Sequence, residues 1–445
     1  FNYQSQTLMV RLKEFKDNTK NVLIQPAPSS SKVYIPLSQH IGKPCAALVK
    51  IGEEVTLGQK IANVQAQVYA PIHSSISGKV VDIQNWPHPA IGRCKTIVIE
   101  NNFKDSPSTI HQPLSSQDQL TSQQIRDIIF EAGIVGMGGA GFPTHIKLNP
   151  PKQIDTLIIN AAECEPFLTA DSSLMVEKTQ EILLGIGLTA KCVGAKNVYI
   201  AIEDNKPEAI KKFQSVSGLR SAVYEHQPNT KNQKPLNTIV LKSRYPQGSE
   251  KQLIKNISGK EIPRNKLPFD LGVVVQNIAT VFAIYEAVYL NKPLYERVIT
   301  VTGSCLTNPK NVLARIGTPI KDLIDFCAPV KEKPAKIIIG GPMMGIAQYT
   351  DTVPVIKTTT GIILFNAKEA SGQEEDFCIR CGECIRECPV GLMPCLINLA
   401  SEKQLWEQTK VNGALDCVEC GICSYVCPAN RNLVQSIKRA KKKLL

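Results

Sequence analysis

The spacing of hydrophobic positions changes along the chain, and each change predicts a different kind of element. Short alternating stretches separated by glycines extend from His40 to Ile83, which is typical of a small β-sandwich. Apolar runs that predict strands follow at 156–160, 197–202 and 221–225. Stretches that predict helices lie around them at 122–132, 171–188 and 206–216, the first with Ser122 as its expected N-cap. Strands alternating with helices indicate a parallel sheet covered by helices.

One apolar stretch approaches the length of a membrane span. Residues 271–290 are mostly apolar, but they include Gln276, Asn277 and Glu286. Such groups are costly in lipid, so the stretch predicts a buried helix rather than a span. Buried amides need partners, which leaves either pairing within the protein or contact with a ligand for Gln276 and Asn277.

The remaining pattern divides the chain into four parts. The first 40 residues are polar and predict an extended arm, and a polar linker is expected at about 101–120. Short strands return between 297 and 365, with a strand–turn–helix from Asn311, which predicts a small α+β domain of structural role. The expected domains are an arm with a β-sandwich, a parallel-sheet domain, the α+β domain and a helical C-terminal module, at 1–115, 116–292, 293–367 and 368–445.

Composition narrows the function classes. The hydrophobic content of 43% over 445 residues is ordinary for a soluble globular protein. The net charge is +12, but basic residues are dispersed and aromatic residues are sparse, so a nucleic-acid partner is not expected. The basic run 438–443 predicts a solvated tail, with contact to acidic lipid or a partner as the alternative. The polar first residues predict no secretory signal.

Two cysteine runs near the C-terminus carry the strongest chemical signal. Cys378 to Pro389 and Cys417 to Pro428 both read C-x2-C-x2-C-x3-C-P, the spacing of ferredoxin-type four-iron clusters. In this arrangement the fourth cysteine of each run serves the other cluster. The predicted first thiol group is Cys378, Cys381, Cys384 and Cys427, and the predicted second thiol group is Cys417, Cys420, Cys423 and Cys388.

Zinc and disulfides are the alternatives for these cysteines. Zinc sites use four ligands, usually as two separated pairs, whereas each run here offers four cysteines and the run occurs twice. Fifteen cysteines, seven of them scattered outside the runs, indicate a reducing compartment. The sequence therefore predicts two 4Fe-4S clusters and a role in electron transfer.

A second informative stretch is rich in glycine. Residues 136–147 contain G-x-G-x-x-G, but a predicted helix precedes the loop and Pro143 follows it, which argues against an ordinary dinucleotide fingerprint. Glycines at 136, 138, 139 and 141 still suggest backbone brought against a flat or phosphorylated ligand, with Lys147 placed to meet it. Further polar residues follow the first predicted strand at Asn160–Glu165, where α/β folds place ligand contacts.

These motifs resemble those of known flavoproteins. The stretches 136–147, 160–166 and 245–250 are similar to the FMN-binding motifs of the NADH-binding subunit of respiratory complex I and related hydrogenase and formate dehydrogenase subunits. That resemblance implies non-covalent FMN contacts from Gly136, Gly138, Gly139, Lys147, Asn160, Glu163, Tyr245, Gly248 and Asn277. It implies nicotinamide nucleotide contacts from Phe142, Glu165 and Glu250. Leu148 and Asn149 stand where that family has an aromatic residue after the lysine.

The N-terminal part resembles the biotinyl/lipoyl fold. The stretches 49–59 and 70–80 are similar to its two halves, but the hairpin tip between them, 63–67, lacks the lysine that a carrier domain presents. This part is therefore expected to be a scaffold rather than a swinging arm.

The whole chain is most similar to the family of C subunits of the Rnf complex. The resemblance implies a lipoyl-like sandwich, a Rossmann-like FMN domain, a small SLBB β-grasp domain and a two-cluster ferredoxin module, in that order. It implies an oxidoreductase subunit that exchanges electrons between NAD(H) and FMN and relays them through both clusters, in a complex that translocates ions. The implied partners are a membrane-associated ferredoxin-like subunit and integral membrane subunits, with docking at the cytoplasmic face of the bacterial inner membrane. A flavin-free iron–sulfur relay adaptor, or an NADH-linked subunit of a soluble hydrogenase or bifurcating enzyme, is the alternative.

Overall fold

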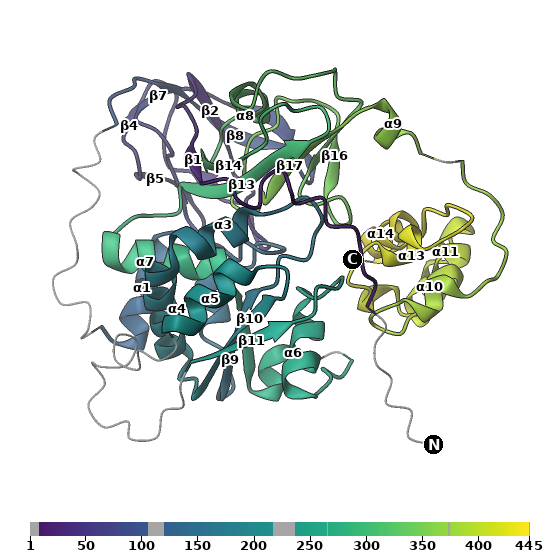
Figure 1. Cartoon of the computed structure of the whole chain (residues 1–445). Helices are drawn as coiled ribbons and strands as arrows, with labels where there is room; N and C mark the ends of the chain where they lie inside the picture. Colours follow the sequence, from purple (N-terminus) through teal and green to yellow (C-terminus); the bar gives the residue numbers. More distant parts are fainter. Residues whose placement is uncertain (1–8, 106–119, 217–235, 265, 373, 445) are drawn as a thin grey trace.

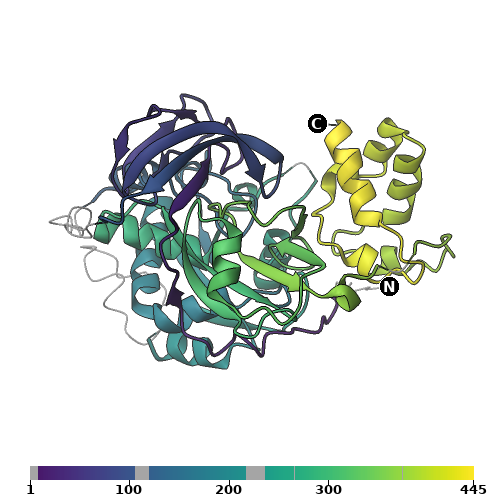
Figure 2. The same ribbon diagram turned by 90° about the horizontal axis from the view of Figure 1, so that it is seen from above.

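The computed structural model describes residues 9–105, 120–216, 236–264, 266–372 and 374–444. Three sheet-containing domains pack together, and a helical cysteine module (residues 376–444) stands to one side of them (Figures 1 and 2). The strand expected at 221–225 and most of the expected linker at 101–120 lie outside the described residues. The boundary expected near residue 115 lies there too.

The N-terminal sandwich is built from two antiparallel sheets, as the alternating pattern predicts. One sheet has the order β2-β8-β7-β4 and the other β3-β5-β6. Val33 and Ile35 on β2 are fully buried with Ile61 and Ile97, because alternate residues of a strand face the same side. The strands are β2 Lys32–Pro36, β3 Ala46–Ala47, β4 Glu54–Val55, β5 Lys60–Asn63, β6 Ile72–His73, β7 Gly78–His88 and β8 Gly92–Asn101.

From residue 9, where its description begins, the N-terminal arm is largely extended, and it is bound to distant parts of the chain. Strand β1 (Gln25–Pro26) pairs in parallel with β14 (Lys310–Arg315) and so adds an edge strand to another domain's sheet. Val10 forms a β-bridge with Tyr245, and Lys16 is buried. The arm therefore ties the domains together, which the local sequence did not indicate.

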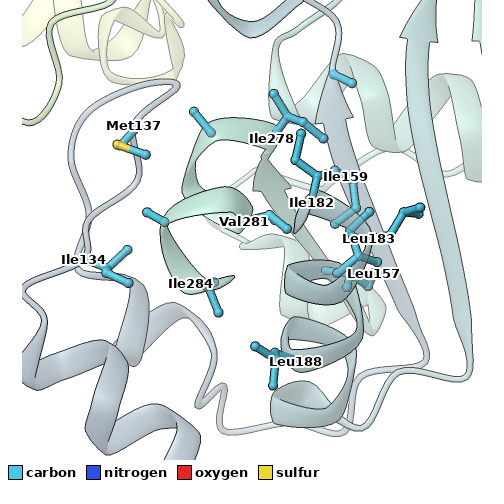
Figure 3. Close-up of a cluster of buried hydrophobic side chains, with 14 of the residues drawn as sticks. Ile134, Met137, Leu157, Ile159, Ile182, Leu183, Leu188, Ile278, Val281 and Ile284 are labelled. Carbon is cyan, nitrogen blue, oxygen red and sulfur yellow. The ribbon is translucent and has the colours of Figure 1, made fainter. Parts of the chain in front are cut away.

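The parallel-sheet domain contains four strands in the order β11-β10-β9-β12, all parallel. The strands are β9 Thr156–Ala161, β10 Asn197–Glu203, β11 Asn237–Leu241 and β12 Val273–Asn277. The helices are α1 Ser122–Glu131, α2 Thr144–Lys147, α3 Ala170–Glu177, α4 Thr179–Val193, α5 Pro207–Val216, α6 Glu250–Ser258 and α7 Ile278–Leu290. Figure 3 shows side chains of β9, α4 and α7 meeting on one face, with Ile159, Ile182 and Val281 fully buried. Helix α6 packs on the opposite face.

Three expectations for this domain were wrong in detail. The stretch 271–290 is not one helix: strand β12 forms near its start, because Val273–Val275 are β-branched and favour a strand, and α7 begins only after Asn277. The helix expected at 171–188 is broken at Lys178 into α3 and α4. The N-cap of α1 is Thr121 rather than Ser122, because Thr121 forms a reciprocal capping box with Gln124.

The mixed-sheet domain has six strands in the order β1-β14-β13-β17-β15-β16. The strand–turn–helix expected after Asn311 is present as β14 and α8, and Ile299, Val301 and Leu323 are buried in its core. Its other elements are β13 Glu296–Gly303, α8 Ile320–Phe326, β15 Lys336–Ile339, β16 Ile346–Gln348 and β17 Gly361–Phe365.

Short helices make up the cysteine module. They are α10 Glu383–Arg386, α11 Pro394–Glu402, α12 Trp406–Val411, α13 Ile422–Tyr425 and α14 Leu433–Leu444, with α9 Ala367–Ala370 in the segment that leads to them. The basic run that was expected to be a solvated tail lies in helix α14, where Arg439, Lys442 and Lys443 are exposed. Leu433, Ile437 and Ala440 bury one face of α14, and Arg439 donates a hydrogen bond to the carbonyl of Ser401 at 2.7 Å. None of the helices in the described ranges is long and apolar enough to cross a membrane.

Candidate flavin and iron–sulfur sites

The glycine-rich loop lies between α1 and α2 beside the end of β12. A Cβ on Gly138 would lie 2.7 Å from Nδ2 of Asn277, so only glycine lets the backbone pass this close. Gly138 and Gly139 are exposed, and a Cβ on Gly139 would meet no atom within 4 Å. The N–H of Gly136 donates to the carbonyl of Phe142 at 2.9 Å, which closes the loop. The loop therefore has a fixed base and an open tip.

Arg297, on β13 of the mixed-sheet domain, holds the base of this loop. The buried guanidinium donates to the carbonyl of Met137 at 3.4 Å and makes a short hydrogen bond to the carbonyl of Lys357. Burial lowers the pKa of Arg297 to about 10, and nearby Asp171 opposes that shift. Sequence reasoning missed Arg297, because it lies in a strand with no motif around it.

The side chains of the two candidate asparagines, Asn160 and Asn277, form hydrogen bonds within the protein. Asn277 accepts from the N–H groups of Ala279 and Thr280 as the N-cap of α7, and its Nδ2 donates to Asp171 at 2.7 Å. Asn160 donates to the carbonyl of Gly248 at 2.8 Å and accepts from the N–H of Ala162 at 3.1 Å. Both side chains thus fix the backbone at the carboxyl ends of β9 and β12.

Glu163 points into the protein rather than toward the open tip of the loop. Its carboxylate accepts from the N–H groups of Asp171 (2.9 Å) and Ser172 (3.3 Å) in the first turn of α3, where a negative charge is favoured. Burial raises the pKa of Glu163 to about 7, and Lys16 opposes this shift. Burial also raises the pKa of Asp171. Asp171 and Lys16 were missed by sequence reasoning, although an acidic residue in the first turn of a predicted helix was a signal for Asp171.

Lys147 and Glu250 form an ion pair across the site. Lys147 Nζ lies 2.7 Å from Oε1 of Glu250, and the two side chains remain 31% and 38% exposed. Phe142, in the loop ahead of α2, is also exposed. A ligand phosphate that approached Lys147 would compete with a carboxylate for a cation that water still reaches.

Glu165 and Tyr245 point toward other parts of the molecule. The Glu165 carboxylate accepts from the N–H groups of Met343 (3.1 Å) and Met344 (2.9 Å) and from the Tyr245 hydroxyl (3.4 Å). The buried Tyr245 hydroxyl also donates to the carbonyl of Cys420 at 2.8 Å. Burial raises the pKa of Glu165 to about 6. The parallel-sheet domain, the mixed-sheet domain and the cysteine module therefore meet at this pair.

The edge of the sheet near the glycine-rich loop fits a flat phosphorylated ligand. Gly138 and Gly139 expose backbone, and Lys147 supplies a cation with access to solvent. Gln276, at the end of β12, is buried, and its Nε2 has no hydrogen-bond partner among the described residues. A donor in this condition is costly unless something binds it. These features are compatible with FMN at this edge.

The second thiol group surrounds a single cavity. Cys388, from the first cysteine run, lines this cavity together with Cys417, Cys420 and Cys423 from the second. Leu392, Val434 and Ile437 supply apolar walls. Four thiols around one apolar cavity are the donor set that a four-iron cluster requires.

The first thiol group is less enclosed. Cys384 and Cys427 pack together in a small apolar cluster with Cys395, while Cys378 and Cys381 are exposed. Burial raises the pKa of both Cys384 and Cys420 to about 12. Iron binds thiolates, so assembly of the clusters must release these protons.

Family comparisons match each part of the chain. The matching models are described as a Nuo51 FMN-binding domain (residues 129–286), an RnfC barrel sandwich hybrid domain (9–104), an SLBB domain (298–347) and a 4Fe-4S binding domain (373–392). The fold class expected from the sequence is thereby confirmed, as are FMN and 4Fe-4S as the cofactors of these domains. A solved structure of an NAD+-reducing NiFe-hydrogenase shares the fold, with a TM-score of 0.51 and 17% identity over 75% of this chain and 63% of that chain.

Several relatives match almost the whole chain. The C subunit of the proton-translocating ferredoxin:NAD+ oxidoreductase complex of Clostridium ljungdahlii is 44% identical over 96% of this chain and 91% of its own length. The C subunit of the Na+-translocating complex of Acetobacterium woodii is 39% identical over 97% and 95%. The C subunit of the ion-translocating oxidoreductase complex of Rhodobacter capsulatus is 40% identical over 96% and 81%. The chain therefore belongs to the family of C subunits of ion-translocating ferredoxin:NAD+ oxidoreductase, or Rnf, complexes.

Proposed function

We propose that this chain exchanges electrons between NAD(H) and FMN and relays them through two 4Fe-4S clusters to or from other subunits of an Rnf complex. Bound FMN accepts or gives a hydride on one side and single electrons on the other, which is the chemistry that such a relay needs. The protein supplies the positions of the groups and the electrostatic environment between them.

The hydrogen bond from Tyr245 to the carbonyl of Cys420 carries this proposal. Tyr245 follows β11 of the FMN-type domain, and Cys420 is a predicted cluster ligand. Gln252 on α6 adds a second contact to the same module, at 2.6 Å from its Nε2 to the carbonyl of Pro389. Two buried hydrogen bonds thus hold the second thiol group against the FMN-type domain, and we infer that a cluster held by this group would be the one next to the flavin.

The flavin contacts divide into two sets. Gly138 and Gly139, whose backbone is exposed, and Lys147, whose ammonium is accessible to solvent, would contact FMN directly. Asn160, Glu163 and Asn277 would act by fixing the backbone around it, since their side chains already have partners. We also retain Gly136, Tyr245 and Gly248 as candidates for FMN, and Phe142, Glu165 and Glu250 for the nicotinamide nucleotide.

Membership of the family suggests the partners and the location of this chain. The named relatives are subunits of complexes that translocate protons or Na+. By analogy, this chain would dock from the cytoplasmic side on integral membrane subunits and on a ferredoxin-like subunit, as a peripheral part of the bacterial inner-membrane complex. Electron flow through it would then be coupled to ion movement by the complex as a whole.

Gly139→Ala tests the flavin site with little risk to the fold. The added methyl group would meet no protein atom within 4 Å, so thermal unfolding should be unchanged while bound flavin falls at least tenfold. The measurement is the visible spectrum of anaerobically purified protein, before and after NADH, together with flavin released on denaturation. Gly372→Ala, whose methyl group would also meet nothing, is the matched control and should keep wild-type flavin.

The same experiment separates the alternatives. A wild-type chain that binds clusters but no flavin, alone and in the assembled complex, would be the flavin-free relay adaptor. Normal flavin content in Gly139→Ala would show that FMN does not lie over the tip of this loop. Flavin that NADH fails to bleach would contradict the nicotinamide-linked part of the proposal.

A further inference from the structure

Helix α14 contributes a charged side chain to the surroundings of the second thiol group. Val434 and Ile437, on one face of this helix, line the cavity that the four thiols surround. Lys441 lies one turn beyond Ile437 on the same face. Its Nζ donates to the carbonyl of the predicted ligand Cys417 at 3.0 Å, and its side chain is 20% exposed.

This lysine is held in place by a second residue of the same ligand loop. Glu419 Oε1 lies 2.5 Å from Lys441 Nζ, and the backbone N–H of Glu419 donates to the Cys417 sulfur at 3.3 Å. Lysines near a helix C-terminus commonly interact with the last carbonyls of their own helix. Lys441 instead reaches another loop, whereas Lys442 and Lys443 are exposed.

The first thiol group has no equivalent. Within the part of the chain that the structure describes, no lysine or arginine donates a hydrogen bond to a carbonyl or sulfur of that group. Arg386 interacts electrostatically with Cys381, but its side chain is 53% exposed and is paired with Glu383 and Glu387. The two candidate cluster sites therefore differ in electrostatics as well as in exposure.

We propose that Lys441 is a positioning residue that raises the reduction potential of the cluster held by the second thiol group. The proposal rests on the assignment of that group as a 4Fe-4S site. Reduction adds a negative charge to a centre already surrounded by thiolates, and a fixed cation nearby stabilises the added charge. The charge is largely shielded from water, so it is screened less than a surface lysine.

The position of Lys441 gives this effect a role in the relay. The second thiol group is the one that contacts the FMN-type domain through Tyr245 and Cys420. A higher potential there stabilises an electron at the site next to the flavin. The electron is then more stable on the cluster of the second thiol group, where it enters or leaves the relay, than on the cluster of the more exposed first thiol group.

Redox titration followed by electron paramagnetic resonance tests this inference. Full-length protein with both clusters assembled would be compared with Lys441→Gln, which removes the charge and keeps a hydrogen-bond donor. In Lys441→Gln the equilibrium constant for reduction of one cluster should fall about tenfold, which lowers its reduction potential by about 59 mV for one electron. The reduction potential of the other cluster should stay unchanged. Lys442→Gln is the matched control and should leave both potentials at their wild-type values.

Two further variants test the sign of the electrostatic effect on the reduction potential. They also keep the inference testable if Lys441→Gln does not assemble the cluster. Glu419→Gln removes a negative charge beside the same thiols and should raise the potential that Lys441→Gln lowers, and Lys441→Arg should restore most of it. Unchanged potentials in both Lys441→Gln and Glu419→Gln would overturn the inference while leaving the proposed relay intact. If Lys441→Gln fails to assemble the cluster, the direction of the shift in Glu419→Gln decides. Wild-type protein without iron and sulfide in cluster amounts would instead refute the proposed function.

Discussion

At the scale of single residues, buried charges join the domains. Lys357, in the mixed-sheet domain, is fully buried, and its Nζ donates to the carbonyls of Pro71 (2.7 Å) and Gly133 (2.6 Å). One side chain thus bonds the N-terminal sandwich and the parallel-sheet domain together. Burial lowers the pKa of Lys357 to about 7, and its interaction with Cys45 opposes that shift.

Lys357 therefore makes stability depend on pH. Its pKa is about 7 in the folded protein against 10.5 for an ordinary lysine, so the unfolded chain binds more protons between these values. Stability should rise as pH increases above 7, by at most about 1.4 kcal/mol per pH unit from this group. Anaerobic unfolding of the wild type and Lys357→Met between pH 7 and 9 measures the difference.

The expected result is that the wild type gains more stability than Lys357→Met over this range. Lys442→Met removes an exposed lysine and serves as the control, so its pH dependence should follow the wild type. Parallel pH profiles for all three proteins would mean that Lys357 keeps its proton throughout.

At the scale of elements, the loop between β15 and β16 connects the mixed-sheet domain to the FMN-type domain and to the cysteine module. It brings the N–H groups of Met343 and Met344 to the carboxylate of Glu165, while the Met343 side chain packs with Tyr245 and Cys420. A loop of a domain expected to be purely structural thus helps hold the cysteine module against the FMN-type domain. Only glycine at position 341 leaves room for the Glu165 carboxylate.

Gly341→Ala should break the contacts between this loop and Glu165. Its Cβ would lie 2.1 Å from Oε2 of Glu165, so the loop must move and leave a buried carboxylate with fewer donors. The expected cost is on the order of 1–3 kcal/mol, with faster amide hydrogen exchange at Met343, Met344 and residues 420–422. Gly372→Ala should exchange like the wild type, and equal exchange in Gly341→Ala would show that this loop does not hold the module.

At the scale of the whole molecule, the two cysteine runs fold as one unit. Cys388 lines the cavity of the second run, and Cys427 packs beside Cys384 of the first run. In the predicted ligand assignment each run takes its fourth cysteine from the other run, so cluster assembly requires both the spacing within each run and the packing of α11 against α14.

This interleaving predicts which variants share a phenotype. Cys388→Ser and Cys417→Ser, although they lie in different runs, should lose the same cluster signal. Cys427→Ser should lose the other one together with Cys384→Ser. Paramagnetic resonance of the dithionite-reduced proteins, with iron content, makes the comparison, and pairing of Cys388→Ser with Cys384→Ser would contradict the assignment.

Residues close together in the sequence were the easiest to interpret. The cysteine spacing, the glycine-rich loop and the alternating strands of the sandwich are local patterns, and local patterns limit backbone geometry and ligand chemistry directly. The division of 271–290 into a strand and a helix was missed, because a continuous apolar run has no periodicity to separate a buried strand from a buried helix. For the same reason, the pattern did not predict that Asn277 is the N-cap of α7.

The sequence by itself determined the kinds of cofactor, the order of the domains and the family, because these follow from residue types at fixed short spacings. Only the tertiary structure decided that Tyr245 contacts the cysteine module, that Glu165 contacts a loop of the mixed-sheet domain, that Lys357 and Arg297 bond separate domains, and that Lys441 lies against a ligand loop. These contacts join residues far apart in the chain. Their geometry depends on how complete domains pack, and no local pattern of polar and apolar residues encodes it.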